Sequence, residues 1–275
     1  MQPRSIAAPD GLRLAAYEAG NPSGPAILFV HGFSQCSECW QRQVYDPALS
    51  GRFRLAAFDL RGHGASDKPL DPARYAEDRF FADDVAAVID GLGLRRPVLV
   101  AWSYAGRIVG DYLERHGTAR IAGINYVCAR TNNQPEFNGP GNRFLTDMIG
   151  DDPAAERAAT RAFVRACFAV APEREMLEKI VADNMLVPAA VRRAHLTRPP
   201  SDGAILSRID VPVLVSQGSE DTLVLPGLGE LTAALVPGAR LSLYQGIGHT
   251  PFIEDPARFN RELADFVLRA NDAPR

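Results

Sequence analysis

The feature that most constrains the fold is the apolar run Val98–Trp102, which leads directly into Ser103 and a helical pattern. A continuous apolar run predicts a strand buried on both faces. The apolar residues within Ala105–Tyr112 have the spacing of a helix. Only a turn fits between the two, so Ser103 would project its hydroxyl from the turn, beside the first N–H groups of the helix.

This arrangement resembles a nucleophile elbow, in which a sharp strand-to-helix turn exposes a reactive serine. The usual Gly-x-Ser-x-Gly pattern is not met, because Ala101 and Ala105 occupy the glycine positions and the nearest glycine is Gly106. Alanine adds the smallest side chain to such a crowded turn. The stretch taken alone leaves two interpretations open, an elbow and a serine in an ordinary strand–helix loop.

The composition is that of an ordinary folded protein, and it excludes several classes of function. The 275 residues can form one large α/β domain or a domain with an insertion, and 46% are hydrophobic and 23% charged. The net charge is −3 with scattered basic residues, which argues against a nucleic-acid partner. We find no signal-peptide pattern in Met1–Gly11 and no run as long as a membrane span. We therefore expect a soluble cytoplasmic protein with no membrane partner.

Four cysteines invite a metal or redox interpretation, because Cys36 and Cys39 form a C-x-x-C pair. A zinc site needs a second pair of ligands at comparable spacing, and the sequence offers none. A thioredoxin-like motif should open a helix within its own βαβ unit, whereas this pair follows His31–Phe33. We expect reduced, structural thiols, and we expect no metal and no cofactor.

Strand and helix patterns alternate along most of the chain. A hairpin is predicted at Ser5–Ala8 and Leu12–Tyr17. Buried strands are predicted at Ala26–Val30, Arg54–Leu60, Val98–Trp102, Ile121–Cys128, Val211–Val215 and Ala239–Tyr244. Helical spacing is found near Glu38–Tyr45, Phe81–Ile89, Ala105–Arg115 and Leu231–Leu235, and after Asp255. This alternation predicts an α/β fold with a mostly parallel central sheet and helices on both faces.

Residues 130–205 differ in character and read as an insertion. Loop-forming residues come first, and helical patterns without strands follow, after Asp152 and over about Pro172–Asp183 and Pro188–Leu196. We interpret residues 130–205 as a helical cap, or lid, on a core made of residues 1–129 and 206–275. Ligands of parallel sheets bind at the carboxyl ends of the strands, which is where such a lid would lie.

A serine needs a base within hydrogen-bond reach to become a nucleophile, and His249 is the best candidate among five histidines. It follows the last predicted strand in a glycine-rich loop, whereas His31 and His63 lie in tight turns that suit a structural role. Asp221 follows the preceding strand and could orient the imidazole, with the adjacent Glu220 as the less favoured choice. The N–H groups of Phe33 and Tyr104 are the candidate oxyanion donors.

Several motifs together resemble the α/β-hydrolase fold superfamily along nearly the whole chain. They are His31–Phe33, Asp59–Ser66, the segment around Ser103, Asp221 and Gly248–His249. The resemblance is to the branch of serine esterases and cofactor-free haloperoxidases, since the dehalogenase and epoxide-hydrolase branches use an aspartate nucleophile. It implies a Ser103–Asp221–His249 triad with Phe33 and Tyr104 as oxyanion donors.

The expected activity is cleavage of a small-to-medium hydrophobic carboxylic ester or lactone by way of an acyl-enzyme. Carbon–carbon bond hydrolysis, perhydrolysis by the same triad and a weakly catalytic ligand receptor remain alternatives. Apolar candidates for the substrate pocket are Trp102, Phe144, Met148, Leu223 and Val224. Arg107, Arg130 and Arg143 could each bind a substrate carboxylate, and the sequence does not choose among them.

Overall fold

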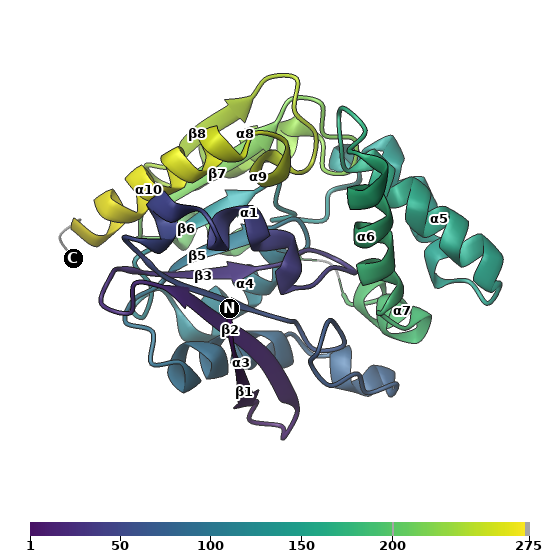
Figure 1. The fold of residues 1–275 in the computed structure, drawn as a ribbon, viewed down its shortest axis with the longest axis horizontal. Helices are drawn as coiled ribbons and strands as arrows, with labels where there is room; N and C mark the ends of the chain where they lie inside the picture. Colours follow the sequence, from purple (N-terminus) through teal and green to yellow (C-terminus); the bar gives the residue numbers. More distant parts are fainter. Residues whose placement is uncertain (200, 273–275) are drawn as a thin grey trace.

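The computed structural model describes residues 1–199 and 201–272. Within them the strands form one eight-stranded sheet in the order β1-β2-β4-β3-β5-β6-β7-β8 (Figure 1). The strands are β1 (Gln2–Ala7), β2 (Arg13–Gly20), β3 (Ala26–Val30), β4 (Arg54–Phe58), β5 (Val98–Trp102), β6 (Gly123–Val127), β7 (Val213–Gly218) and β8 (Arg240–Tyr244). Strand β2 is antiparallel to both β1 and β4, and every other neighbouring pair is parallel. The predicted mostly parallel sheet is confirmed.

Helices cover both faces of the sheet. The α-helices are α1 (Gln41–Val44), α2 (Pro47–Ser50), α3 (Asp78–Gly91), α4 (Ala105–His116), α5 (Pro153–Ala166), α6 (Arg174–Met185), α7 (Ala189–Leu196), α8 (Pro226–Leu235), α9 (Pro251–Glu254) and α10 (Pro256–Asp272). The 3₁₀ segments are η1 (Ser37–Trp40), η2 (Pro72–Tyr75), η3 (Pro135–Phe137), η4 (Pro140–Leu145), η5 (Asp147–Ile149) and η6 (Ala204–Arg208). None of the helices in residues 1–199 and 201–272 combines the length and apolarity needed to cross a bilayer.

Alternate side chains of the central strands pack into two separate cores, one on each face of the sheet. In β3, Leu28 and Val30 belong to the core under α3 and α4, while Ile27 and Phe29 belong to the core under α1 and α10. Side chains of a strand point alternately to opposite faces, so a strand covered on both sides is apolar throughout. This explains why the continuous apolar runs predicted the central strands well.

The boundaries of several elements differ from those predicted. The predicted helix near Glu38–Tyr45 divides into η1 and α1, and a separate short helix, α2, follows. Helix α2 is separate from α1 for a local reason. Pro47 is its first residue, and Asp46 caps it by accepting a hydrogen bond from Leu49 N at 2.9 Å. Strand β6 is shorter than its predicted range, and α8 begins earlier than predicted, at Pro226.

Helices α5, α6 and α7 lie together at one side of the sheet, at the right of Figure 1. The buried guanidinium of Arg192, on α7, joins this group internally through Glu156 Oε1 at 2.8 Å, Met148 O at 3.1 Å and Asn184 O at 2.6 Å. Its Nε also donates to Ser34 Oγ at 2.9 Å, in the loop after β3. The α5–α7 segment is therefore tied to the sheet beside the predicted oxyanion loop. The division into core and cap at residues 130 and 205 stays a prediction.

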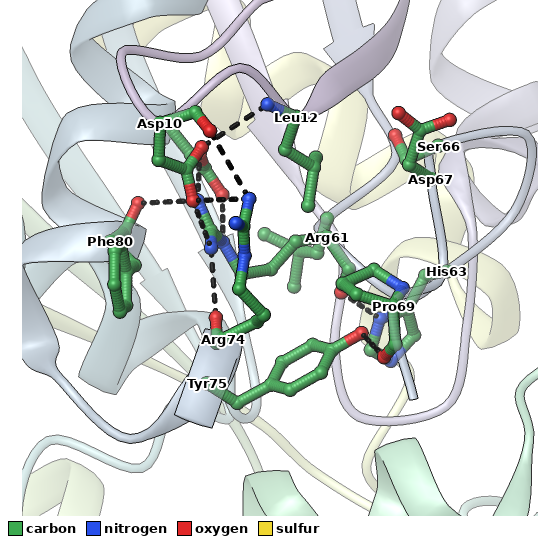
Figure 2. Close-up of polar contacts among 12 residues, drawn as sticks. Asp10, Leu12, Arg61, His63, Ser66, Asp67, Pro69, Arg74, Tyr75 and Phe80 are labelled. Carbon is green, nitrogen blue, oxygen red and sulfur yellow. Dashed lines mark hydrogen bonds and ion pairs between the residues drawn. The ribbon is translucent and has the colours of Figure 1, made fainter. Parts of the chain in front are cut away.

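The turn after β4 is organised by the buried side chain of Arg61. Its guanidinium donates to both carboxylate oxygens of Asp84 at 2.7 Å, to Asp10 Oδ2 at 3.1 Å and to Arg74 O at 2.8 Å. Figure 2 shows Arg61 and Arg74 converging on Asp10, which lies in the hairpin turn between β1 and β2. The Asp59–Ser66 motif thus joins the hairpin, β4 and α3.

Candidate active site

Ser103 lies on a strained turn between β5 and α4. Its φ is +56°, in the left-handed region that non-glycine residues rarely adopt. The surrounding backbone holds this conformation, because Ser103 N donates to Val127 O and Ser103 O accepts from the N–H groups of Gly106 and Arg130, each at 2.9 Å. Strain that is enforced by the surrounding chain is common at functional sites. The turn therefore has the geometry expected of a nucleophile elbow.

The two alanines that break the glycine pattern are fully buried, and the turn forms around them. The close approach occurs at Gly106 instead. A Cβ at Gly106 would lie 2.9 Å from both Ala129 Cβ and Arg130 O, which is closer than real Cβ atoms come to other atoms. This chain thus needs a glycine one position later than the usual motif, where α4 passes the end of β6.

Asp221 and His249 are brought together from the ends of β7 and β8. His249 Nδ1 and Asp221 Oδ2 are 2.7 Å apart, and both side chains are buried. The other carboxylate oxygen of Asp221 accepts from Leu223 N at 2.9 Å and Val224 N at 3.0 Å, which fixes its orientation. Glu220, the less favoured choice of partner, instead accepts a hydrogen bond from the Ser219 hydroxyl at 3.1 Å.

Ser103 and His249 line the same cavity. Within the described chain, no direct hydrogen bond joins their side chains. Catalytic hydrogen bonds are often long in unliganded enzymes and shorten when substrate binds. The imidazole is thus oriented by Asp221 and faces the cavity that the serine also lines.

The backbone around His249 is held from two sides. Trp102 Nε1 donates to His249 O at 2.9 Å, and His249 N donates to Cys167 O at 2.8 Å, at the end of α5. Glu254 accepts from Gly248 N at 3.0 Å and from Ala169 N at 2.9 Å. The position of the imidazole therefore depends on both the nucleophile strand and the α5–α7 segment.

The two predicted oxyanion donors have free N–H groups. Within residues 1–199 and 201–272, neither Phe33 N nor Tyr104 N donates to a protein acceptor, whereas the next amide, Ser34 N, donates to His63 Nε2 at 3.2 Å. Gly32 lets this loop approach the elbow, since a Cβ there would lie 3.1 Å from Ser103 Cβ. Backbone N–H groups without acceptors beside a serine are suited to binding an oxyanion.

His31 and His63 have the structural role that the sequence favoured. A backbone N–H can only donate, so His31 Nε2 accepts from Leu60 N at 3.0 Å and its Nδ1–H donates to Gly32 O at 2.8 Å. The same reasoning gives His63 an Nδ1–H that donates to Arg61 O at 3.0 Å. Burial lowers the pKa of both imidazoles, so they are neutral supports of the loop that contains Phe33.

Two cavities meet at Ser103. The first, of about 100 Å³, has His249 and Trp102 on its wall, and the second, of about 290 Å³, has Tyr104. We call them the imidazole-side cavity and the far-side cavity. The α5–α7 segment supplies apolar side chains to the first, namely Phe163, Val164, Phe168, Met176 and Ile180. The far-side cavity carries polar side chains, namely Arg107, Arg130, Asn133, Asn138 and Asn142.

The predicted pocket residues are only partly brought together. Trp102 lines the imidazole-side cavity and also packs on Phe252 in the core, while Leu223 and Val224 line the far-side cavity. Phe144 and Met148 line neither cavity, so their placement in the pocket is corrected. Met148 is fully buried on η5, just before α5, and Phe144 lies against the Arg143 guanidinium. Apolar character alone does not separate a pocket wall from a core, which is why these two were misplaced.

Cys128 lies beside the Asp221–His249 pair. Its Sγ and the nearest ligand atoms of those two residues lie within 4.8 Å of one another, a set that could in principle hold a metal ion. Burial, together with the Asp221 carboxylate, raises the pKa of the Cys128 thiol well above its ordinary value. A metal binds the thiolate rather than the thiol, so this donor set fits a metal poorly.

Comparison with known proteins places the chain in a family. A family model described as the alpha/beta hydrolase fold matches residues 25–256. A solved structure from Burkholderia cenocepacia, provisionally named an aryl esterase, is 37% identical over 98% of this chain and 100% of that one, with a TM-score of 0.94. The chain belongs to the α/β-hydrolase fold family.

Two further relatives cover nearly the whole chain. The esterase RhEst1 from Rhodococcus sp. ECU1013 is 31% identical over 97% of this chain and 98% of its own, with a TM-score of 0.90. The non-heme chloroperoxidase CPO-A1 of Kitasatospora aureofaciens is 28% identical over 94% of this chain and 97% of its own length. A shorter match, 40% identical, joins 45% of this chain to 21% of EphD of Mycobacterium tuberculosis, which carries an oxidoreductase name. The matched segment of this chain thus covers about a fifth of that relative's length.

Proposed function

We propose that the protein is a serine hydrolase that cleaves carboxylic esters through an acyl-enzyme. The observation that carries this proposal is the 2.7 Å contact between His249 Nδ1 and Asp221 Oδ2, with the imidazole on the wall of the cavity that Ser103 lines. The names of full-length relatives, an esterase and a chloroperoxidase, support the same class of chemistry. Lactones share the reacting group and belong to the same proposal.

The chemistry follows from the geometry of these groups. His249 removes the proton of the Ser103 hydroxyl as its oxygen attacks the ester carbonyl, and Asp221 stabilises the imidazolium that forms. The N–H groups of Phe33 and Tyr104 donate to the tetrahedral oxyanion. The imidazolium then protonates the leaving alcohol, and a water molecule activated by His249 releases the acid from Ser103.

Hydrolysis of p-nitrophenyl butyrate by the purified protein tests the proposal. Ser103→Ala and His249→Ala should each abolish turnover, and the double variant should be no slower than either single one because the residues act as a unit. His116→Ala, at the far end of α4, is the matched control and should keep wild-type activity. A fluorophosphonate probe should label the wild type at Ser103 and leave Ser103→Ala unlabelled. Wild-type turnover equal to that of Ser103→Ala would favour a ligand receptor instead.

Perhydrolysis is the second candidate, and the similarity to the chloroperoxidase CPO-A1 favours testing it. Here hydrogen peroxide replaces water in the attack on the acyl-enzyme, and the products are a peracid and free Ser103. The peracid oxidises halide in solution. Peroxide-dependent bromination of an indicator in acetate buffer, lost in Ser103→Ala, would establish this activity. Bromination that persists in Ser103→Ala would show that the triad is not its source.

A further inference from the structure

The two cavities on either side of Ser103 differ in the groups that face a substrate. Both are lined by Phe33, Ser103 and Phe163, so a substrate held at the serine can extend into each. His249 lines only the imidazole-side cavity, where most residues of the α5–α7 segment are apolar. That cavity also contains Glu38, Arg42 and Lys179, and Lys179 pairs with Asp183 at 2.8 Å. Arg130 and several asparagines line only the far-side cavity. The site is therefore chemically asymmetric about the attacking oxygen.

Arg130 is the one cation of the far-side cavity that lacks an ion-pair partner within the described chain. Its backbone N–H donates to Ser103 O at 2.9 Å, which fixes the residue directly behind the nucleophile. Its guanidinium donates to two neutral acceptors, Asn138 Oδ1 at 2.7 Å and Leu223 O at 3.4 Å. By contrast, Arg107 in the same cavity is paired with Asp78 at 3.3 Å.

Arg130 is partly buried, and a partly buried guanidinium without a carboxylate partner is stabilised when a ligand supplies one. Burial lowers the pKa of Arg130, with the Asp221 carboxylate opposing that shift, but an arginine stays charged at neutral pH. Asp221 does not neutralise Arg130, since its oxygens are taken by His249 and by Leu223 N and Val224 N. The guanidinium keeps donors that match the two oxygens of a carboxylate.

The position of His249 decides which part of the substrate meets Arg130, an argument that rests on the proposed function. The imidazolium must protonate the leaving alcohol, so the alcohol lies in the imidazole-side cavity. The acyl chain then extends into the far-side cavity, toward Arg130. We propose that the preferred substrate is a half-ester of a dicarboxylic acid, with its free carboxylate bound by Arg130 and an apolar alcohol on the other side of Ser103.

The reaction balances as an ordinary ester hydrolysis. Ser103 Oγ forms a bond to the ester carbonyl carbon, the bond to the alcohol oxygen breaks, and the alcohol leaves with the proton held by His249. Water then cleaves the acyl-enzyme and gives the free dicarboxylic acid. The charged acyl group differs from the small-to-medium hydrophobic ester or lactone predicted from the sequence.

The test compares esters that differ only in terminal charge. Mono-p-nitrophenyl esters of glutarate, adipate and pimelate are each paired with a neutral ester of equal length that ends in an isopropyl group, with uncatalysed hydrolysis subtracted. The wild type should favour at least one half-ester over its neutral partner by tenfold or more in kcat/KM. Arg130→Gln should lower that ratio at least tenfold, while Arg143→Gln, an exposed arginine that lines neither cavity, should leave it unchanged.

Binding gives a readout that does not depend on turnover. Calorimetry with the adipate half-ester should give a Kd for Ser103→Ala at least tenfold lower than for Ser103→Ala/Arg130→Gln, with thermal unfolding used to verify that both variants are folded. Equal Kd values, or a kcat/KM ratio that Arg130→Gln does not change, would overturn the inference. If the wild type hydrolyses no ester but the Kd values differ, the proposed function fails and the carboxylate site stands.

Discussion

The indole of Trp102 donates a hydrogen bond to the backbone carbonyl of His249 at 2.9 Å, linking the residue before the nucleophile to the base that would activate it. The two rings are also 5.7 Å apart between centroids. Trp102 belongs at once to the core, where it packs on Phe252, and to the cavity wall. A substitution at Trp102 should therefore disturb the position of the His249 imidazole more than it disturbs the fold.

Trp102→Phe should lower kcat for p-nitrophenyl butyrate about fivefold, since a neutral hydrogen bond contributes about 1 kcal/mol and that is its equivalent in rate. The matched control is Trp40→Phe. Trp40 packs on the same Phe252, but its Nε1 has no hydrogen-bond partner among the described residues. Both variants lose similar packing, so thermal unfolding should change by similar amounts while only Trp102→Phe loses activity. Equal kcat in the two variants would contradict a positioning role for the indole.

Gly106 and Gly110 lie one turn apart on α4 and should respond in opposite ways to alanine. A Cβ at Gly106 would meet Ala129 and Arg130, whereas nothing lies within 4 Å of a Cβ at Gly110. Gly106→Ala should destabilise the protein by about 2 kcal/mol through overpacking and should also reduce activity by moving the elbow. Gly110→Ala should stabilise it by about 0.5–1 kcal/mol. Urea unfolding of the two variants measures both changes in stability. Equal effects would mean that Ala129 and Arg130 move to accommodate the added methyl group at little cost.

The comparison of the two glycines explains what the sequence could predict about the elbow. The strand, turn and helix around Ser103 follow from apolar spacing, which depends only on local burial. The motif itself was ambiguous, because Ala101 and Ala105 replace its glycines. Whether a methyl fits depends on what packs against it, and the end of β6 is about 25 residues away in sequence. Only the assembled sheet shows that the close approach is at Gly106.

The same limit applies to the substrate pocket. Asp221 and His249 were predictable because each follows a strand, and parallel strands bring their carboxyl ends to one edge. Much of the walls of the two cavities comes from the α5–α7 segment and the loop around Asn138. Hydrophobic periodicity in the sequence does not show how these segments pack on the sheet. Met148 and Phe144 are apolar and close in sequence to the residues that line the cavities, yet neither lines a cavity wall. The role proposed for Arg130 depends on its having no carboxylate partner among the described residues, and no sequence pattern shows such an absence.

Substitution of Arg61 should affect the stability of the protein rather than its activity. Its guanidinium is almost fully buried and bonds both oxygens of Asp84, a geometry that lysine cannot reproduce. Arg61→Lys should lower the free energy of unfolding by about 3 kcal/mol, because it leaves buried acceptors without donors. The control is Arg79→Lys, whose exposed pair with Glu77 should leave the free energy of unfolding essentially unchanged. Denaturant titration of both variants measures the difference, and a small loss for Arg61→Lys would mean that water replaces the missing donors.

His195, on α7, should make the stability of the protein depend on pH. Burial, aided by the positive charge of Arg198, lowers the pKa of this imidazole to about 3. An unfolded chain has a histidine pKa of about 6.5, so between these two values the unfolded state binds a proton at residue 195 that the folded state does not. The contribution of His195 to stability is therefore fully present above about pH 6.5 and is lost as the pH falls toward 3.

His195→Phe removes that titration and retains an aromatic ring among the rings of His63, Tyr75, Phe81 and Tyr104. Between pH 7 and pH 5 the wild type should lose about 2 kcal/mol more unfolding free energy than His195→Phe, since each pH unit below 6.5 is equivalent to about 1.36 kcal/mol for one proton. Urea unfolding of both proteins at the two pH values measures this difference directly. Parallel losses would show that the ring is already protonated in the folded state, which would require a nearby acceptor to stabilise the imidazolium.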